Sequence, residues 1–174
     1  VPTQDRAAVG ALLKAQGQID MVIPRGGKSL VARVQDEARV PVLAHLDGIC
    51  HTYIHAKADP AMAEAIAVNA KMRRTGICGS TETLLIDQDY PEPARLIGAL
   101  LDAGCEVRAD DTLMELDART VPAEEADWGT EYLDSIVSAK MVSGVDEAIE
   151  HIARYGSQHT ESIITNDEAA AADF

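Results

Sequence analysis

The thiol of Cys78 has the surroundings in this sequence that best suit a chemical role. It lies in the stretch Thr-Gly-Ile-Cys-Gly-Ser, shortly after the cations Lys71, Arg73 and Arg74. Flanking glycines let a backbone approach a substrate closely, and neighbouring cations favour the thiolate, which is the reactive form of cysteine. The pattern is compatible with a nucleophile, although by itself it favours the alternative of an inert buried thiol.

A second group of residues concentrates soft metal ligands in one short stretch, namely His45, Cys50, His51 and His55. A zinc site needs ligands at matching spacing, and Cys50 and His51 would point to opposite faces of a strand. We therefore expect no metal site here, and packing or turn-stabilising roles for these residues. Cys105 follows a helix-ending glycine in an apolar run and is expected to be a structural thiol.

The run Arg25-Gly26-Gly27-Lys28 has the residue types of an anion-binding turn. It lacks the full spacing of a Walker loop or of a dinucleotide fingerprint. Alone it favours a tight strand-to-helix turn with two solvated cations over a phosphate contact. Glu131, which precedes an apolar run, has a weaker claim, since most such acids are only solvated.

The elements that must position these residues alternate between strand-like and helix-like segments. This alternation predicts an α/β fold with three layers, in which a mostly parallel sheet is flanked by helices. We expect strands at residues 19–24, 41–44, 49–56, 82–87, 106–109, 135–141 and 162–165, and helices at residues 5–16, 29–39, 60–74, 91–103 and 145–155. The acidic residues 110–130 are expected to form a long connection with one short helix or strand, and the chain is expected to stop inside a helix that begins at Asp167.

Length and charge limit the classes of protein that this chain can represent. Its 174 residues fit one domain, residues 1–174, and with 3% aromatic residues the core must be aliphatic. A net charge of −14 disfavours nucleic acid and anionic membranes as partners, so an anionic substrate would need a local cluster of cations. Three cysteines without paired spacing, and no apolar run of membrane-spanning length, predict a reducing, cytoplasmic location.

Four stretches of the chain, taken together, resemble one known family. They are residues 19–30 (IDMVIPRGGKSL), 40–54 (VPVLAHLDGICHTYI), 69–86 (NAKMRRTGICGSTETLLI) and 155–165 (YGSQHTESIIT). In order and across nearly the whole chain, they are similar to the gamma-glutamyl phosphate reductases, or glutamate-5-semialdehyde dehydrogenases, of the aldehyde dehydrogenase superfamily. The resemblance covers only the catalytic domain and implies that the family's cofactor domain and C-terminal extension lie outside this chain.

The resemblance implies a reaction for Cys78 in proline biosynthesis. The thiolate attacks gamma-glutamyl phosphate, phosphate leaves, and the resulting thioester is reduced by NADPH to glutamate 5-semialdehyde. The Cys78 N–H would help to hold the developing oxyanion. This chain alone is expected to be inactive, and the full-length enzyme is expected to be a homo-oligomer.

The resemblance also implies how the cofactor NADP(H) is bound. Glu131 matches a superfamily glutamate that hydrogen-bonds the nicotinamide ribose, and Gly26 and Gly27 match a turn beside the nicotinamide. Hydrolytic aldehyde dehydrogenases carry a water-activating glutamate two residues before this turn, where the present chain has Pro24. The substitution favours a reductase that must protect its thioester from water.

Substrate binding is inferred from charge. Arg25, Lys28 and Arg74 are expected to supply the local positive charge that an acyl phosphate requires. The chain departs from the reductase pattern at Thr75, where proline is usual, and at Gly79, where asparagine is usual. Two alternatives stay open: another superfamily member with a different acyl phosphate or aldehyde as substrate, and a non-catalytic ligand-binding module of this fold.

Overall fold

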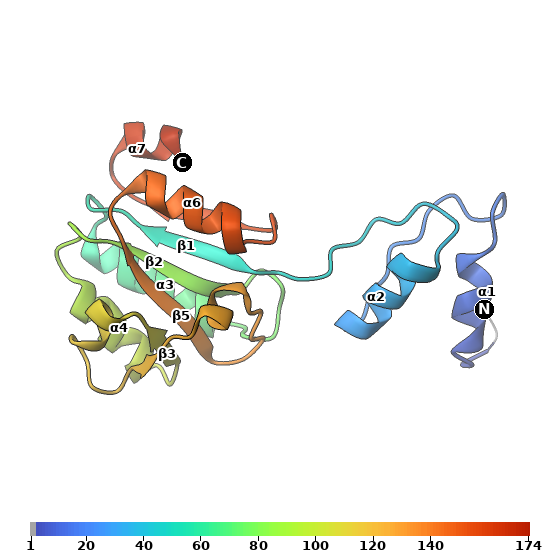
Figure 1. Cartoon of the computed structure of the whole chain (residues 1–174), viewed down its shortest axis with the longest axis horizontal. Helices are drawn as coiled ribbons and strands as arrows, with labels where there is room; N and C mark the ends of the chain where they lie inside the picture. The colour runs from blue at the N-terminus through green and yellow to red at the C-terminus, as the bar shows by residue number, and fades with distance from the viewer. Residues whose placement is uncertain (1–2) are drawn as a thin grey trace. The chain divides into compact units, whose positions relative to one another are not determined.

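The computed structural model describes residues 3–174, which divide into two compact units at Asp47 (Figure 1). The first unit contains helices α1 (Ala7–Leu13) and α2 (Lys28–Glu37), which were predicted at slightly greater length. Its two expected strands, at residues 19–24 and 41–44, were wrong. They meet only at one isolated bridge, between Val22 and Val42.

The sequence around that bridge explains why no ladder extends from it. Pro24 and Pro41 lack the backbone N–H that a continuing ladder would need. Met21, Ile23 and Leu43 are 52–61% exposed, so these apolar side chains do not line a buried sheet face. The two short apolar runs have the composition of strands, but no further strands among the described residues pair with them to form a sheet.

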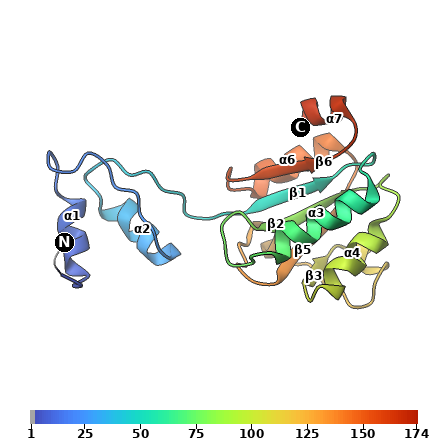
Figure 2. The same ribbon diagram turned by 180° about the vertical axis from the view of Figure 1, so that it is seen from behind.

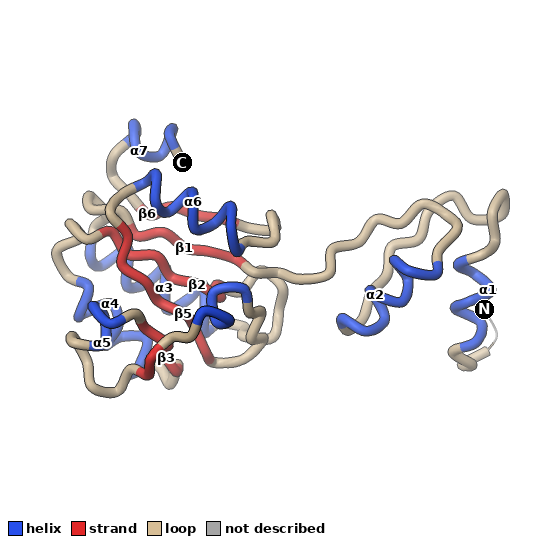
Figure 3. The backbone as a smooth tube through the Cα atoms, in the orientation of Figure 1, coloured by secondary structure: helices blue, strands red, loops and turns tan. Residues whose placement is uncertain are grey.

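The second unit, Gly48–Phe174, is built on a six-stranded sheet with the order β4-β3-β5-β2-β1-β6 (Figures 1 and 3). The strands are β1 (Cys50–Ile54), β2 (Thr81–Asp87), β3 (Glu106–Ala109), β4 (Val121–Pro122), β5 (Ile136–Val142) and β6 (Glu161–Ile164). Every pairing in the sheet is parallel. The predicted α/β fold with a mostly parallel sheet is confirmed.

Helices cover both faces of this sheet (Figures 1 and 2). On one face lie α3 (Pro60–Met72), α4 (Pro93–Asp102) and α5 (Asp111–Met114), and on the other lie α6 (Val145–Tyr155) and α7 (Glu168–Asp173). The structure therefore has the three layers that the alternating pattern predicts. Among the described residues, no helix is long and apolar enough to cross a membrane.

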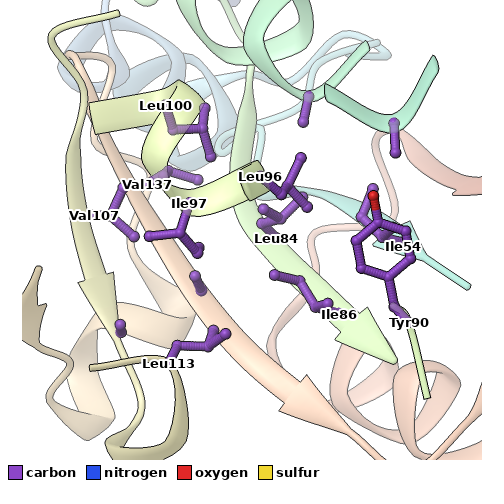
Figure 4. Packing of buried hydrophobic residues seen from close by; sticks show 14 of the residues in the cluster. Ile54, Leu84, Ile86, Tyr90, Leu96, Ile97, Leu100, Val107, Leu113 and Val137 are labelled. Atoms are coloured by element: carbon purple, nitrogen blue, oxygen red, sulfur yellow. The ribbon is translucent and has the colours of Figure 1, made fainter. Parts of the chain in front are cut away.

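Alternate residues of the central strands supply the two halves of the core. Ile54, Leu84 and Ile86 belong to the cluster beneath α3, α4 and α5, which Figure 4 shows from close by. Tyr53 and Leu85 point to the opposite face and pack with Val142, Ala148 and residues of α6. Every residue of β1 and β2 is buried, as expected for central strands of a sheet that is covered on both faces.

Local signals set the ends of the helices. Asp59 accepts a hydrogen bond from the Met62 N–H at 2.8 Å, and Pro60 occupies the first position of α3, as predicted. Gly104 follows α4 with a φ of 85°, a left-handed conformation that glycine adopts at little cost. Asp167 caps α7, which confirms the predicted start of that helix.

The connection at residues 110–130 is more ordered than expected. It contains α5, the short strand β4 and a 3₁₀ helix, η1 (Glu125–Gly129), with a capping box between Glu124 and Asp127. Asp127 also accepts a hydrogen bond from Arg108 Nη1 at 2.7 Å. The acidic residues that obscured any period in the sequence are therefore partly cap residues.

Candidate active site

The chemistry-bearing residues of the second unit gather at the edge of the sheet where the parallel strands begin. We call this the amino edge: residues 48–49 before β1, residues 73–80 before β2, residues 130–135 before β5 and residues 156–160 before β6. The strands β5, β2, β1 and β6 are consecutive neighbours in the sheet. Since all of them run in the same direction, the four loops that precede them lie at one edge (Figure 3).

Cys78 lies in the turn between α3 and β2 and is half-buried. Its backbone N–H has no hydrogen-bond partner within residues 3–174, whereas its carbonyl accepts a hydrogen bond from Cys50 Sγ at 3.1 Å. The turn is anchored behind Cys78, because Ser80 Oγ donates to the Lys71 carbonyl at 3.2 Å. A fixed backbone with a free N–H beside a partly exposed sulfur is the arrangement that nucleophilic catalysis needs.

The two other cysteines have different surroundings. Cys50 and Cys105 are 2% and 3% exposed. Burial raises the pKa of both thiols to about 11, so both stay protonated near neutral pH. The buried thiol predicted for Cys105 is confirmed, and Cys78 is the cysteine that is partly exposed.

Gly48 connects Cys78 to Glu131. A Cβ atom added to Gly48 would lie 2.2 Å from the Cys78 carbonyl oxygen, so only glycine fits at this close approach of two backbones. The Gly48 N–H donates to Glu131 Oε1 at 2.9 Å. Glu131, predicted as a cofactor ligand, thus lies in the same constellation as the thiol. The role of Gly48 was missed, since the Asp-Gly pair indicated only a turn.

His159 is a further residue of the amino edge that the sequence analysis did not single out. It lies between α6 and β6, and its Nδ1 is 2.9 Å from Thr160 Oγ1 and 3.5 Å from Cys50 Sγ. The stretch YGSQHTESIIT was recognised as a whole. The signal that could have found His159 is its position two residues before a strand, at the same edge as Cys78.

The glycine turn predicted at Arg25-Gly26-Gly27-Lys28 is present in the first unit, where Gly27 is the N-cap of α2. All four residues are exposed. Lys28 Nζ lies 2.5 Å from Asp47 Oδ1, so part of its charge is already neutralised. Arg74, in the second unit, is exposed shortly before Cys78.

Three of the four residues considered as metal ligands lie in the second unit and have separate roles there. His51 Nδ1 bonds to Glu161 Oε2 at 2.9 Å, and His55 Nδ1 bonds to Thr165 Oγ1 at 2.8 Å. Cys50 donates to the Cys78 carbonyl. These contacts are of the packing and turn-stabilising kind that was expected.

Comparison with solved structures shows which known fold this chain resembles. An acetylating aldehyde dehydrogenase from Geobacillus thermoglucosidasius matches 97% of this chain and 46% of its own, with a TM-score of 0.71 at 22% identity. A glyceraldehyde-3-phosphate dehydrogenase from Methanocaldococcus jannaschii, complexed with NADP, matches 95% of this chain and 46% of its own, with a TM-score of 0.66 at 13% identity. At these identities the likeness is one of fold alone, and that fold is aldehyde dehydrogenase-like.

Sequence comparison is more specific, although no protein-family model matches the chain. A gamma-glutamyl phosphate reductase from Rhizorhabdus wittichii is 64% identical over all 174 residues, which are 41% of its length. The crystal structure of the gamma-glutamyl phosphate reductase from Thermotoga maritima is 39% identical, with a TM-score of 0.94 over the whole of this chain and 42% of its own. The predicted resemblance to gamma-glutamyl phosphate reductases is confirmed, for a chain that spans about two fifths of the length of these relatives.

Proposed function

We propose that the enzyme containing this chain reduces gamma-glutamyl phosphate to glutamate 5-semialdehyde through a thioester on Cys78. The observation that carries the proposal is the Cys78 turn, in which the one cysteine that is not buried has a backbone N–H without a partner among residues 3–174. Identity to gamma-glutamyl phosphate reductases along the whole chain supports the choice of substrate.

The residues around Cys78 suit attack on an acyl phosphate. The sulfur attacks the carbonyl carbon, and the negative charge that develops on the carbonyl oxygen is held by the free Cys78 N–H. Phosphate is the leaving group, and a thioester remains on the enzyme. Pro24, which stands where hydrolytic relatives carry a general base, leaves that thioester without a water-activating group at this position.

NADPH, when bound, supplies the hydride that reduces the thioester. Glu131 suits the predicted contact with a ribose hydroxyl, because Gly48 holds its Oε1 while its second oxygen has no partner within residues 3–174. Gly26 and Gly27 would lie beside the nicotinamide. At Gly27 an added Cβ would meet nothing within 4 Å, so the turn has room for a ligand to approach.

Arg25, Lys28 and Arg74 are proposed to attract the acyl phosphate. A net charge of −14 repels this anion at long range, so binding it requires a local cluster of cations. Arg74 is the best candidate of the three, since it is exposed and four residues from Cys78 in the chain. Lys28 is the weakest, because Asp47 already holds its ammonium group.

The remaining parts of the proposal concern the whole enzyme. Both units are proposed to belong to one catalytic domain, which depends on a cofactor domain elsewhere in the enzyme and is inactive alone. The enzyme acts in proline biosynthesis in the cytoplasm as a homo-oligomer. Gamma-glutamyl phosphate and inorganic phosphate are its small-molecule partners.

A substrate panel with the full-length enzyme tests the proposal. In the reverse direction, glutamate 5-semialdehyde with phosphate should reduce NADP⁺ with a kcat/KM at least about 100-fold above that of an aldehyde lacking the amino and carboxylate groups. Equal or better use of the simpler aldehyde would overturn the substrate assignment. Reduction that needs no phosphate would overturn the acyl-phosphate step.

A further inference from the structure

Hydrogen bonds hold the loop that carries His159 against the start of β1. The Ile49 N–H donates to Ser157 Oγ at 2.8 Å, and the His51 N–H donates to the Thr160 carbonyl at 3.3 Å. Because β1 pairs with both β6 and β2, the loop before β6 is fixed close to the Cys78 turn.

The imidazole of His159 lies next to the Cys78 thiol. One of its ring nitrogens is within 4.8 Å of the Cys78 sulfur. The contacts of Nδ1 with Thr160 Oγ1 and Cys50 Sγ orient the ring. Since both Cys78 and His159 are half-buried, a small side-chain rotation or one bridging water molecule is enough to join the ring nitrogen to the sulfur.

We propose that His159 is the general base that takes the thiol proton from Cys78 and then passes it to the departing phosphate. The removal of the thiol proton by His159 is inferred from the geometry of the two side chains. The transfer of that proton to phosphate rests on the proposed function. His159 adds an acid–base group to the site, which the thioester chemistry leaves without an assigned proton carrier.

The proton transfer balances in atoms and charge. The S–H bond of Cys78 breaks as its proton moves to His159, and a bond forms between the sulfur and the acyl carbon. The bond between that carbon and the phosphate oxygen breaks, and the oxygen takes the proton from His159, so hydrogen phosphate leaves. No electrons are exchanged in this step, because the reduction belongs to the hydride transfer that follows.

Within the second unit, the other ionisable groups around the pair are poorly suited to this role. Cys50 is a buried thiol whose pKa burial raises to about 11. Glu131 accepts the Gly48 N–H through one oxygen, and the proposed function assigns its other oxygen to the cofactor ribose. Glu161 Oε2 bonds to both the backbone N–H and the ring Nδ1 of His51. The arginines near the thiol in sequence, at positions 73 and 74, are always charged and cannot accept a proton.

Alkylation of Cys78 tests the proposal in the full-length enzyme without any substrate. The rate of reaction with iodoacetamide is measured by mass spectrometry of the Cys78 peptide, at about pH 6.5 and about pH 10. His159→Gln is expected to slow alkylation at least about 10-fold at the lower pH and to leave it unchanged at the higher pH, where a free thiol is ionised anyway. His55→Gln, which alters a histidine at the opposite edge of the sheet, is the matched control and should behave as wild type.

His159→Asn separates a base from a structural contact. Asparagine can keep a hydrogen bond to Thr160 but cannot take the proton, so the expected result is the same loss at low pH as for glutamine. Wild-type reactivity in the asparagine variant would overturn the proposal. An equal slowing at both pH values would also overturn it, since the histidine would then only shape the turn.

Turnover then tests the transfer of the proton to phosphate. In the full-length enzyme, kcat for phosphate-dependent semialdehyde oxidation should fall about 100-fold in His159→Gln with a smaller change in KM. If the enzyme does not use this substrate, the proposed function fails while the alkylation result still decides the role of His159. A normal kcat together with slow alkylation would overturn the transfer to phosphate.

Discussion

The two edges of the parallel sheet differ in how their polar groups are used. At the carboxyl ends of the strands, the carboxylates are tied to protein donors. Asp87 accepts the Tyr53 hydroxyl at 2.6 Å, Asp110 accepts the Met141 N–H at 2.7 Å, and Asp167 caps α7 and pairs with Lys57. These contacts hold loops and helix ends in place and leave the acids little capacity to bind anything else.

At the amino edge, hydrogen bonds fix the loops in place, but some polar groups remain available to a ligand. Among the described residues, the Cys78 N–H has no hydrogen-bond partner; the Cys78 sulfur is partly exposed, and His159 lies beside it. Open α/β sheets usually bind ligands beyond the carboxyl ends of their strands. In this sheet the carboxyl edge is structural and the opposite edge has the features of a reactive site.

The largest effect should follow from removing the sulfur at the amino edge. In the full-length enzyme, Cys78→Ala is expected to lower kcat/KM by on the order of 10⁴-fold or more, because the nucleophile is lost. Cys105→Ala removes a buried thiol and should keep activity per folded molecule, with a loss of about 1 kcal/mol in the free energy of unfolding. Steady-state kinetics of both variants test this prediction. An equal loss of activity in the two variants would contradict the role of Cys78 as the nucleophile.

A side chain at Gly48, where the backbone passes close to that of Cys78, should have the next largest effect on activity. Gly48→Ala places a Cβ where the Cys78 carbonyl now lies, so the turn has to shift, and displacement of a reacting group can cost about 100-fold in rate. Gly129→Ala, where an added Cβ meets nothing within 4 Å, is the matched control. Kinetics of both variants in the full-length enzyme should separate them, and equal kcat/KM values would contradict the constraint at Gly48.

At the carboxyl edge, a change should affect stability alone. Asp110→Ala removes the N-cap of α5 and the acceptor of the Met141 N–H, at an expected cost of about 2 kcal/mol in the free energy of unfolding. Activity per folded molecule should be unchanged. Urea unfolding measures the loss of stability, and kinetics under conditions where the variant is folded measure its activity. A fall in kcat in the folded variant would contradict a purely structural role for the carboxyl edge.

Acid conditions should reveal a stability effect that could be mistaken for catalysis. Burial lowers the pKa of His151 to about 3, so it is neutral in the folded state, whereas in the unfolded chain it takes a proton below about pH 6.5. Stability is therefore lost as pH falls from about 6.5 towards 3, by up to about 1.4 kcal/mol per pH unit. His151→Gln should make this loss of stability smaller, as measured by urea unfolding at several pH values. An identical slope in both proteins would contradict the assignment.

Local patterns predicted most of the second unit. The strand at residues 106–109 and the helix at residues 145–155 have the predicted bounds, because turn signals and periodicity lie within each segment. The site could be predicted only in part. Gly48 and Glu131 are 83 positions apart, and Cys50 and His159 are 109 apart. Such contacts follow from the order of strands in the sheet, which no local pattern encodes.

Trapping the thioester tests the reactive amino edge most directly. The full-length enzyme is mixed with glutamate 5-semialdehyde and NADP⁺ without phosphate, quenched in acid and digested for mass spectrometry. The added glutamyl mass should lie on the Cys78 peptide and disappear when phosphate is supplied before quenching. An adduct on Cys50 or Cys105, or no adduct while NADP⁺ is reduced, would contradict the assignment of the chemistry to Cys78.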